Sequence, residues 1–170
     1  MRTKWLALLS VAVLAIGLTG CAGYRLGSML PTDIETVYVP SVLNETSEPL
    51  IEIETTRAVI EQIQRDGSLR IAAEDTADAI VRIRIREYRI EPVAFDTTRR
   101  SDVRQYRIRM TASLLMTRRS DDSVIVERPA VRGEGVFNMA GDLSSSKLIG
   151  LPVAAEDLAT KLVQQMVEAW

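Results

Sequence analysis

The sequence predicts an α+β fold, a two-layer sandwich of order β-α-β-β-β-α in which two helices cover one face of a mostly antiparallel sheet. Three observations predict it. Several segments alternate apolar and polar residues, which is typical of half-buried strands. Two other segments carry apolar residues at helical spacing. The polar face of the alternating segments is rich in arginine, so we expect both helices on the apolar face.

The first strand and the first helix lie near the start of the predicted domain. Residues 34–40 are β-branched and alternating, and Pro40 ends this strand because proline cannot donate a hydrogen bond to a neighbouring strand. After a polar link at 41–47, the spacing predicts a helix from about 48 to 66, with Ser47 as N-cap and Gly67 as its left-handed stop. The predicted apolar stripe of this helix consists of Leu50, Ile53, Val59, Ile60 and Ile63.

The two central strands, 77–90 and 103–117, show the clearest alternation. The apolar face of the first consists of Ala79, Val81, Ile83 and Ile85. Its other face consists of Ile80, Arg82, Arg84 and Arg86. The apolar face of the second consists of Tyr106, Ile108, Met110, Ala112, Leu114 and Met116, and its polar face of Gln105, Arg107, Arg109, Thr111 and Ser113. A slip of one residue would bury the arginines, so the register is strongly specified.

The remaining segments predict two strands, a loop and a helix. Residues 69–71 have room for a short additional strand, which is not counted in the order above. Residues 124–137 predict the last strand, in which Pro129 and two nearby glycines indicate an edge position, a bulge or both. Residues 138–150 predict a Gly/Ser loop, and Pro152 is expected to start the final helix. The apolar stripe of that helix consists of Ala155, Leu158, Ala159, Leu162, Val163, Met166 and Trp170.

The N-terminus carries a lipoprotein-type signal. A short basic lead precedes the apolar run 5–18, which is too short for a transmembrane helix and favours a secretory signal peptide over residues 1–20. The segment LTGC, ending at Cys21, resembles the bacterial lipobox, which implies that the Cys21 thiol receives a lipid and that the chain is cut before it. Ala22, rather than Asp, favours the outer membrane. Residues 21–32 are then the lipidated cysteine with a short tether, and 33–170 a single domain.

The composition argues against an enzyme. Cys21 is the only cysteine and the chain has no histidine, so once Cys21 is lipidated it has no thiol nucleophile, disulfide or thiolate metal site, and it lacks the commonest general base. Ser144 and Lys147 match the Ser-x-x-Lys pattern of penicillin-recognising enzymes, but the companion motifs are missing and the segment is predicted to be a loop. We expect no catalytic residue, no metal and no cofactor. The interpretation as a lipid-anchored hydrolase has only this Ser-x-x-Lys segment in its favour.

Arginines are concentrated in the central strands. Arg82, Arg84 and Arg86 share one strand face, and Arg107 and Arg109 share the next. Adjacent strands lie about 4.8 Å apart, so these five side chains are expected to stand together and to hold anionic groups through charge-assisted bonds. They are the candidate contact for an anionic ligand. The alternative is a solvated face whose arginines pair with neighbouring acids. Nucleic acid would fit the charge, but a location outside the cytoplasm favours an anionic glycolipid or an acidic partner surface.

Several short motifs resemble a known family. Residues 21–27 (CAGYRLG), 36–40 (TVYVP) and 44–46 (NET), followed by a helix and the strand start at 77–79 (ADA), are similar to the lipopolysaccharide-assembly lipoproteins of the LptE family. Arg25 stands where relatives often have His. The resemblance implies a lipid-anchored protein on the periplasmic face of the outer membrane. It also implies that the protein partners an LptD-like β-barrel, helps that barrel to fold or plugs it, and contacts lipopolysaccharide.

A second interpretation comes from another class of protein. The opening strand, the proline, the polar turn and the long helix are also similar to periplasmic lipoproteins that activate peptidoglycan synthases. Those regulators usually carry a long disordered linker after the lipidated cysteine. Here the first strand begins only about a dozen residues after Cys21, which favours the lipopolysaccharide-assembly interpretation.

Overall fold

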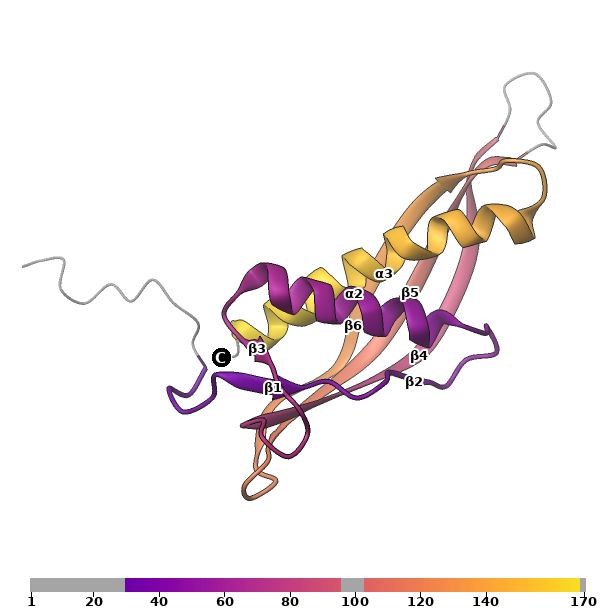
Figure 1. Ribbon diagram of the computed structural model, residues 1–170. Helices are drawn as coiled ribbons and strands as arrows, with labels where there is room; N and C mark the ends of the chain where they lie inside the picture. Colours follow the sequence, from indigo (N-terminus) through magenta and orange to yellow (C-terminus); the bar gives the residue numbers. More distant parts are fainter. Residues whose placement is uncertain (1–29, 96–102, 169–170) are drawn as a thin grey trace, which may run out of the picture.

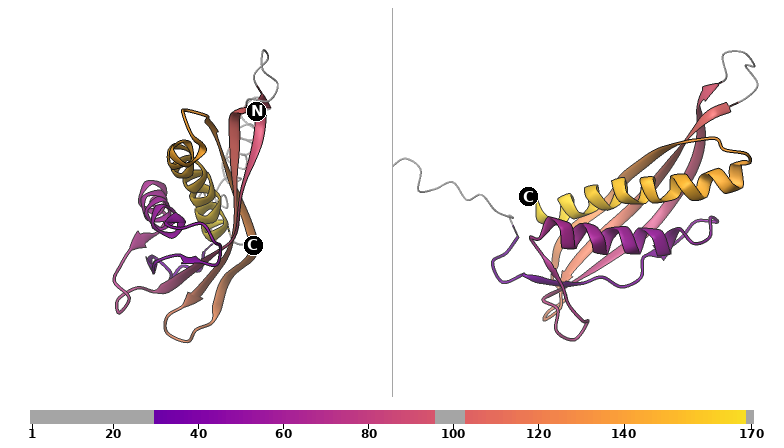
Figure 2. Two further views of the ribbon diagram at one scale, coloured as in Figure 1. Left: turned by 90° about the vertical axis from the view of Figure 1, so that its right-hand side faces the viewer. Right: turned by 45° about the horizontal axis from the view of Figure 1, so that its top comes forward.

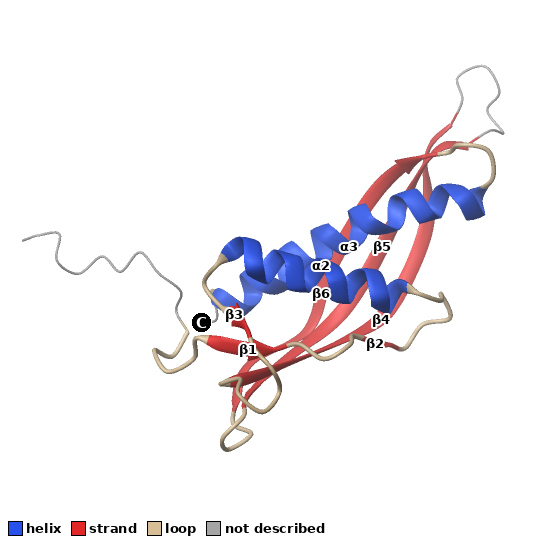
Figure 3. Ribbon diagram, viewed as in Figure 1, coloured by secondary structure: helices blue, strands red, loops and turns tan. Residues whose placement is uncertain are grey.

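Two helices lie side by side on one face of a twisted sheet in the computed structural model (Figure 1). The structure describes residues 30–95 and 103–168. The helices are α2 (Ile51–Asp66) and α3 (Leu143–Val167), and the strands are β1 (Thr36–Tyr38), β2 (Leu43–Asn44), β3 (Arg70–Ile71), β4 (Ala79–Phe95), β5 (Val103–Arg118) and β6 (Val124–Asn138). Both helices lie on the same face of the sheet (Figures 2 and 3). The predicted two-layer α+β sandwich is therefore confirmed.

The sheet is mixed, and its three long strands are antiparallel. The strand order is β3-β1-β4-β5-β6, and β2 also pairs with β4. The short strand β1 runs parallel to both β3 and β4, and β2 runs parallel to β4. The strand β3 lies where a short strand is predicted, whereas β2 falls inside the predicted link 41–47. Val42, an apolar residue just before β2, is buried, and its burial places the segment 41–47 beside β4.

The last strand, β6, is both an edge strand and bulged, as predicted. It is the terminal member of the sheet order. Leu114 pairs with Arg128 and Ala112 pairs with Val131, so two residues of β6 lie opposite Ser113. Pro129 is one of these two residues, and the bulge accommodates it because proline has no N–H to donate to β5.

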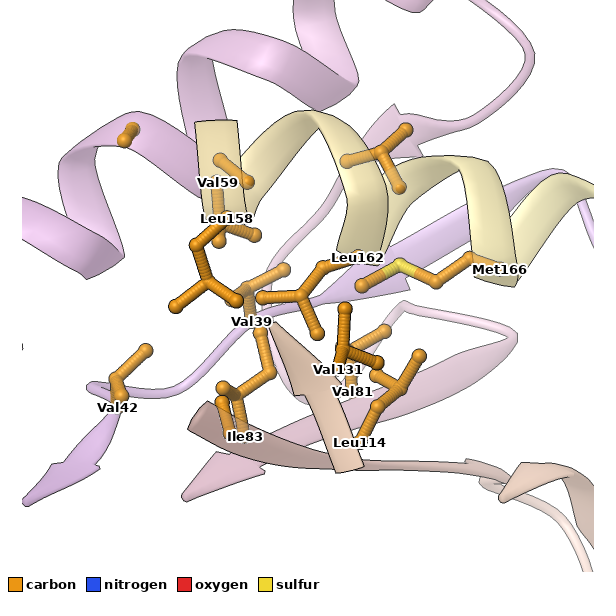
Figure 4. Close-up of a cluster of buried hydrophobic side chains, with 14 of the residues drawn as sticks. Val39, Val42, Val59, Val81, Ile83, Leu114, Val131, Leu158, Leu162 and Met166 are labelled. Atoms are coloured by element: carbon orange, nitrogen blue, oxygen red, sulfur yellow. The ribbon is translucent and has the colours of Figure 1, made fainter. Parts of the chain in front are cut away.

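Most buried side chains of β4 and β5 are those that the alternation predicts. Ile80 is an exception: it is predicted on the other face with the arginines, yet it is buried. All four apolar residues predicted for β4 are buried, and in β5 five of the six are buried while Tyr106 packs against the core from its rim. Figure 4 shows Val81, Ile83 and Leu114 beneath Leu158 and Leu162 of α3. Burying a side chain of this size stabilises the fold by about 1.5–3 kcal/mol, so this layer supplies much of the folding free energy.

The helix α2 starts later than predicted. It begins at Ile51, and Leu50 occupies the N-cap position with a φ of 69° and no side-chain hydrogen bond to the helix. Ser47 therefore does not cap it, and the predicted start at about residue 48 is wrong. The predicted stop is confirmed: Gly67 has a φ of 76°, and its N–H donates to the carbonyl oxygen of Ile63.

The buried stripe of α2 is also shifted from the predicted one. The buried residues are Ile51, Thr55, Ala58, Val59 and Ile63. Leu50 and Ile53, both predicted to be inside, are each 58 % exposed. Thr55 takes an interior position instead because its hydroxyl donates to the carbonyl oxygen of Ile51 at 2.7 Å, which satisfies the polar atom inside the protein. Val59 and Ile63 are thus the fully buried part of the predicted stripe.

The helix α3 is longer than predicted. It starts at Leu143, so the loop predicted at 138–150 is wrong over its second half, and Pro152 lies inside the helix. The start is fixed by Asp142, whose carboxylate accepts a hydrogen bond from the N–H of Ser145 at 2.9 Å. Packing of a long helix on the sheet outweighs the hydrogen bond that Pro152 removes. The predicted stripe is buried throughout, except for Trp170, which lies outside the described residues.

Two glycines of β6 bring α3 close to the sheet. A Cβ atom on Gly133 would lie 2.4 Å from the Cβ of Leu158, and one on Gly135 would lie 2.6 Å from the backbone nitrogen of Ala154. No side chain fits in this space. The two glycines are therefore explained by the close approach of the helix, while the bulge of β6 lies nearer to Pro129.

Candidate anion-binding face

The five candidate arginines lie on the sheet face opposite the helices. Their neighbours along β4 and β5 are buried beneath α2 and α3, and alternation turns the arginines the other way. A bulge interrupts β4: Ile85 pairs with Ala112 and Glu87 with Thr111, which leaves Arg86 as the extra residue. Beyond this bulge the inward positions of β4 become Tyr88 and Ile90, which pack against the core.

The register divides the five arginines into two groups along the sheet. Arg82, Arg84 and Arg86, the first arginine group, lie opposite the part of β5 that contains Leu115 and Ser113. Arg107 and Arg109, the second arginine group, lie farther along and pair with Glu91 and Arg89 of β4. All five share one face, but they form two clusters rather than one.

The first arginine group has few acidic partners. Arg82 Nη1 donates to the hydroxyl of Thr117 and Arg86 Nε donates to the hydroxyl of Ser113, both at 3.2 Å. Arg84 Nη1 reaches Glu45 only at 3.5 Å, and just over half of the Arg84 side chain is exposed. A hollow of about 210 Å³ adjoins these side chains. Its lining consists of the three arginines together with Ser113, Leu114, Leu115, Glu127, Arg128 and Pro129.

The second arginine group is enclosed by carboxylates. Arg109 lies 2.9 Å from Glu91 and 3.6 Å from Glu134, and Arg107 lies 3.5 Å from Glu134. The neighbouring Arg89 pairs with Glu87 at 2.5 Å. These acids compensate the like-charge contact of Arg89 with Arg109 across the strands. A second hollow, of about 420 Å³, lies here and is lined by cationic and anionic side chains together.

Glu134 is a contact that strand pattern alone did not identify. It comes from β6 and sits opposite Arg109, so only the register of a third strand reveals it. Its backbone N–H donates to Asp157 of α3 at 2.8 Å, which fixes this stretch of β6. The alternation of β6 is the sequence signal that could have placed Glu134 on the outer face. Residues 131, 133, 135 and 137 are buried, so residue 134 between them faces outward.

The sequence also singles out Cys21, Ser144 and Lys147. Cys21, the predicted lipid attachment site, lies outside the described residues. The Ser-x-x-Lys segment opens α3 and is not a loop, which corrects that part of the sequence argument. Lys147 is held by Glu48, with 2.5 Å between Nζ and Oε1, while Ser144 is exposed. Lys147 therefore forms a structural ion pair, which joins α3 to the segment just before α2.

The described residues offer neither a metal cluster nor a spanning helix. Within 30–95 and 103–168, no group of acidic, histidine or cysteine side chains is arranged to hold a metal ion. Neither α2 nor α3 combines the length and the apolar character that crossing a bilayer would require. Guanidinium groups, which the outer face does carry, bind anions through charge-assisted hydrogen bonds.

Comparison with known proteins identifies the family. The LptE family model, described as lipopolysaccharide-assembly, matches residues 34–169. The chain belongs to the LptE family. LptE proteins are assembly lipoproteins, and membership gives this chain a role in lipopolysaccharide assembly. No curated protein matches the sequence.

Solved structures with the same fold are distant in sequence. A Xanthomonas campestris protein aligns with a TM-score of 0.57 at 11% identity, covering 84% of this LptE chain and 90% of its own. A minor lipoprotein from Acinetobacter baumannii aligns with a TM-score of 0.51 at 10% identity, covering 78% and 92% of the two chains. At such identities these likenesses establish the fold alone.

Proposed function

We propose that this LptE-family chain is an outer-membrane lipoprotein, anchored through Cys21 on the periplasmic face, that partners an LptD-like β-barrel in lipopolysaccharide assembly. It assists the folding of the barrel or plugs it, and it contacts lipopolysaccharide through the arginine-bearing face of its sheet. The observation that carries the proposal is the family match over residues 34–169, which covers nearly the whole predicted domain.

The architecture supports such a role. Both helices cover one face of the sheet, so within 30–95 and 103–168 no helix covers the arginine-bearing face (Figure 2). Leu30, the first described residue, follows Cys21 by nine positions, which is at most about 30 Å of extended chain. A tether of that length keeps the domain close to the membrane that holds the lipid.

Affinity capture from outer membranes tests the partnership. The tagged full chain, solubilised in mild detergent, is expected to recover a large β-barrel protein in a stable complex. The control is an unrelated outer-membrane lipoprotein that carries the same tag. Recovery of a peptidoglycan synthase without any barrel would contradict the proposal and would support the synthase-activator interpretation.

A further inference from the structure

The two arginine groups differ in the charge that surrounds them. The hollow beside the first arginine group is lined by Arg82, Arg84 and Arg86 and by one acidic residue, Glu127. Arg128 also lines it, but the Arg128 guanidinium donates to Gln165 of α3 at 2.6 Å and is not counted as free for an anion. The hollow beside the second group brings four cationic side chains together with three carboxylates. The first hollow is therefore strongly cationic, whereas the second is close to balanced.

This difference determines where an anion can bind. In the second group, Glu91 already lies 2.9 Å from Arg109, and Glu134 lies 3.5–3.6 Å from both arginines, so an incoming anion must displace these carboxylates or be repelled by them. The Nε of Arg107 is buried, where it makes no hydrogen bond with the described residues. In the first group, Arg82 and Arg86 donate only to hydroxyl oxygens, and a bond from a guanidinium group to phosphate is stronger than one to a neutral oxygen. Exchange of these partners for a phosphate is favourable.

The backbone arranges the first group as a row. Alternate residues of a strand lie about 7 Å apart on one face, so neighbouring guanidinium groups can converge on a single phosphate, and the whole row can serve a headgroup with more than one. Ser113, directly opposite Arg84, is small and leaves space between β4 and β6. Its hydroxyl, already bonded to Arg86, lies within the same hollow.

The first group also lies at the end of the sheet nearer to the start of the described chain. β1 begins six residues after Leu30, and its Tyr38 pairs with Ile80, two residues before Arg82. In Figure 1 the first described residues and the end of α3 lie together at one end of the molecule, and the far ends of β4 and β5 lie at the other. An anchor at Cys21 would hold the first group closer to lipid headgroups than the second.

We infer that the hollow formed by Arg82, Arg84 and Arg86 is a phosphate-binding site for the headgroup of an anionic glycolipid, and that Arg107 and Arg109 belong to a structural ion-pair network outside it. The inference rests on the proposed function, because it assumes that the chain meets such a lipid. It narrows the five-arginine face to three binding residues, with Ser113 as a neighbouring hydroxyl.

Two matched double variants test this assignment. Arg84→Gln with Arg86→Gln and Arg107→Gln with Arg109→Gln each remove two positive charges from the same face. Binding of the purified full chain is measured with intact lipopolysaccharide and with the same material after enzymatic removal of its phosphates. We expect the first double variant to bind intact lipopolysaccharide roughly ten- to a hundred-fold more weakly, and the second to stay within about twofold of wild type.

Each outcome is decisive once circular dichroism has shown that both variants are folded. Equal losses in the two variants would overturn the assignment to the first group, and unchanged binding after removal of the phosphates would overturn the phosphate chemistry. Competition by millimolar inorganic phosphate would support a site that recognises the phosphate group itself. Capture of the barrel by wild type is scored separately. If the chain captures the barrel but binds lipopolysaccharide equally well with and without its phosphates, the phosphate site is rejected. If binding depends on the phosphates but no barrel is captured, the partnership is rejected.

Discussion

Asp78 joins the first strand to the centre of the sheet through one carboxylate oxygen. Its Oδ2 accepts hydrogen bonds from the backbone N–H groups of Glu35 and Thr36 at 3.1 and 2.9 Å, and from the hydroxyl of Thr36 at 2.7 Å. The hydroxyl and backbone bonds from Thr36 and Glu35 hold the pKa of Asp78 below its usual 3.8. These bonds attach β1, the first strand of the sheet along the chain, to the start of β4.

Replacing this carboxylate is expected to weaken the fold in a pH-dependent way. Because the pKa of Asp78 is lower in the folded chain than in the unfolded one, its stabilisation is present above the unfolded pKa and is lost as the pH falls through the folded pKa. Asp78→Ala should lower the free energy of unfolding by about 1–2 kcal/mol at pH 7, measured by urea denaturation. The deficit should shrink below pH 4.

The neighbouring acid Asp75 provides the control for this measurement. Its side chain is exposed and makes no hydrogen bond with the described residues. Asp75→Ala should therefore stay within about 0.5 kcal/mol of wild type at every pH. An Asp78→Ala deficit that keeps the same size from pH 7 to pH 3 would show that the ionised carboxylate is not the stabilising group.

The sequence located the arginines but not their partners. Alternation alone turned Arg82, Arg84, Arg86, Arg107 and Arg109 away from the core, because every second residue of a half-buried strand must face outward. The carboxylates around Arg107 and Arg109 depend on which residues of three strands meet, and a bulge after Ile85 shifts that register. A pattern read along one strand carries no information about such pairings.

At the scale of elements, the contact between α3 and β6 depends on Gly133. Gly133→Ala would bring its Cβ within 2.4 Å of the Cβ of Leu158, so the helix must move away from the sheet. Such overpacking should lower the free energy of unfolding by about 1–3 kcal/mol. Arg132→Ala, on the outward face of the same strand, is the control and should change it by less than about 0.5 kcal/mol. Equal effects of the two variants would contradict the close packing of α3 on β6.

The helix boundaries show where local patterns fail. Pro152 was expected at the start of the last helix because proline favours the first turn. The segment before Pro152 contains several serines, and it is helical because Asp142 caps the start of α3. Ser146 is buried there, and its hydroxyl oxygen accepts a hydrogen bond from the N–H of Ala140. At the start of α2, Leu50 and Ile53 were expected inside because they are apolar, yet both are exposed, and Thr55 and Ala58 face the interior instead. Tertiary packing determined both results.

At the scale of the whole molecule, the element order was enough to predict the layers. Two amphipathic helices and a sheet with one apolar face can bury all their apolar surfaces in one compact arrangement, in which both helices pack on that face. The parallel pairing of β1 with β4 could not be predicted in this way, because short strands carry too few residues to fix their neighbours. The outcome is an elongated sandwich with one helix-covered face and one arginine-bearing face (Figures 1 and 2).

The central claim is that this lipoprotein serves lipopolysaccharide assembly from a lipid anchor, and the amount of lipopolysaccharide at the cell surface tests it most directly. In the native bacterium, depletion of the chain should lower surface lipopolysaccharide, measured on intact cells with a binding probe. Expression of wild type should restore it, whereas Cys21→Ala at equal abundance should not, because that variant lacks the anchor. Surface lipopolysaccharide that stays at its normal level throughout depletion would contradict the account.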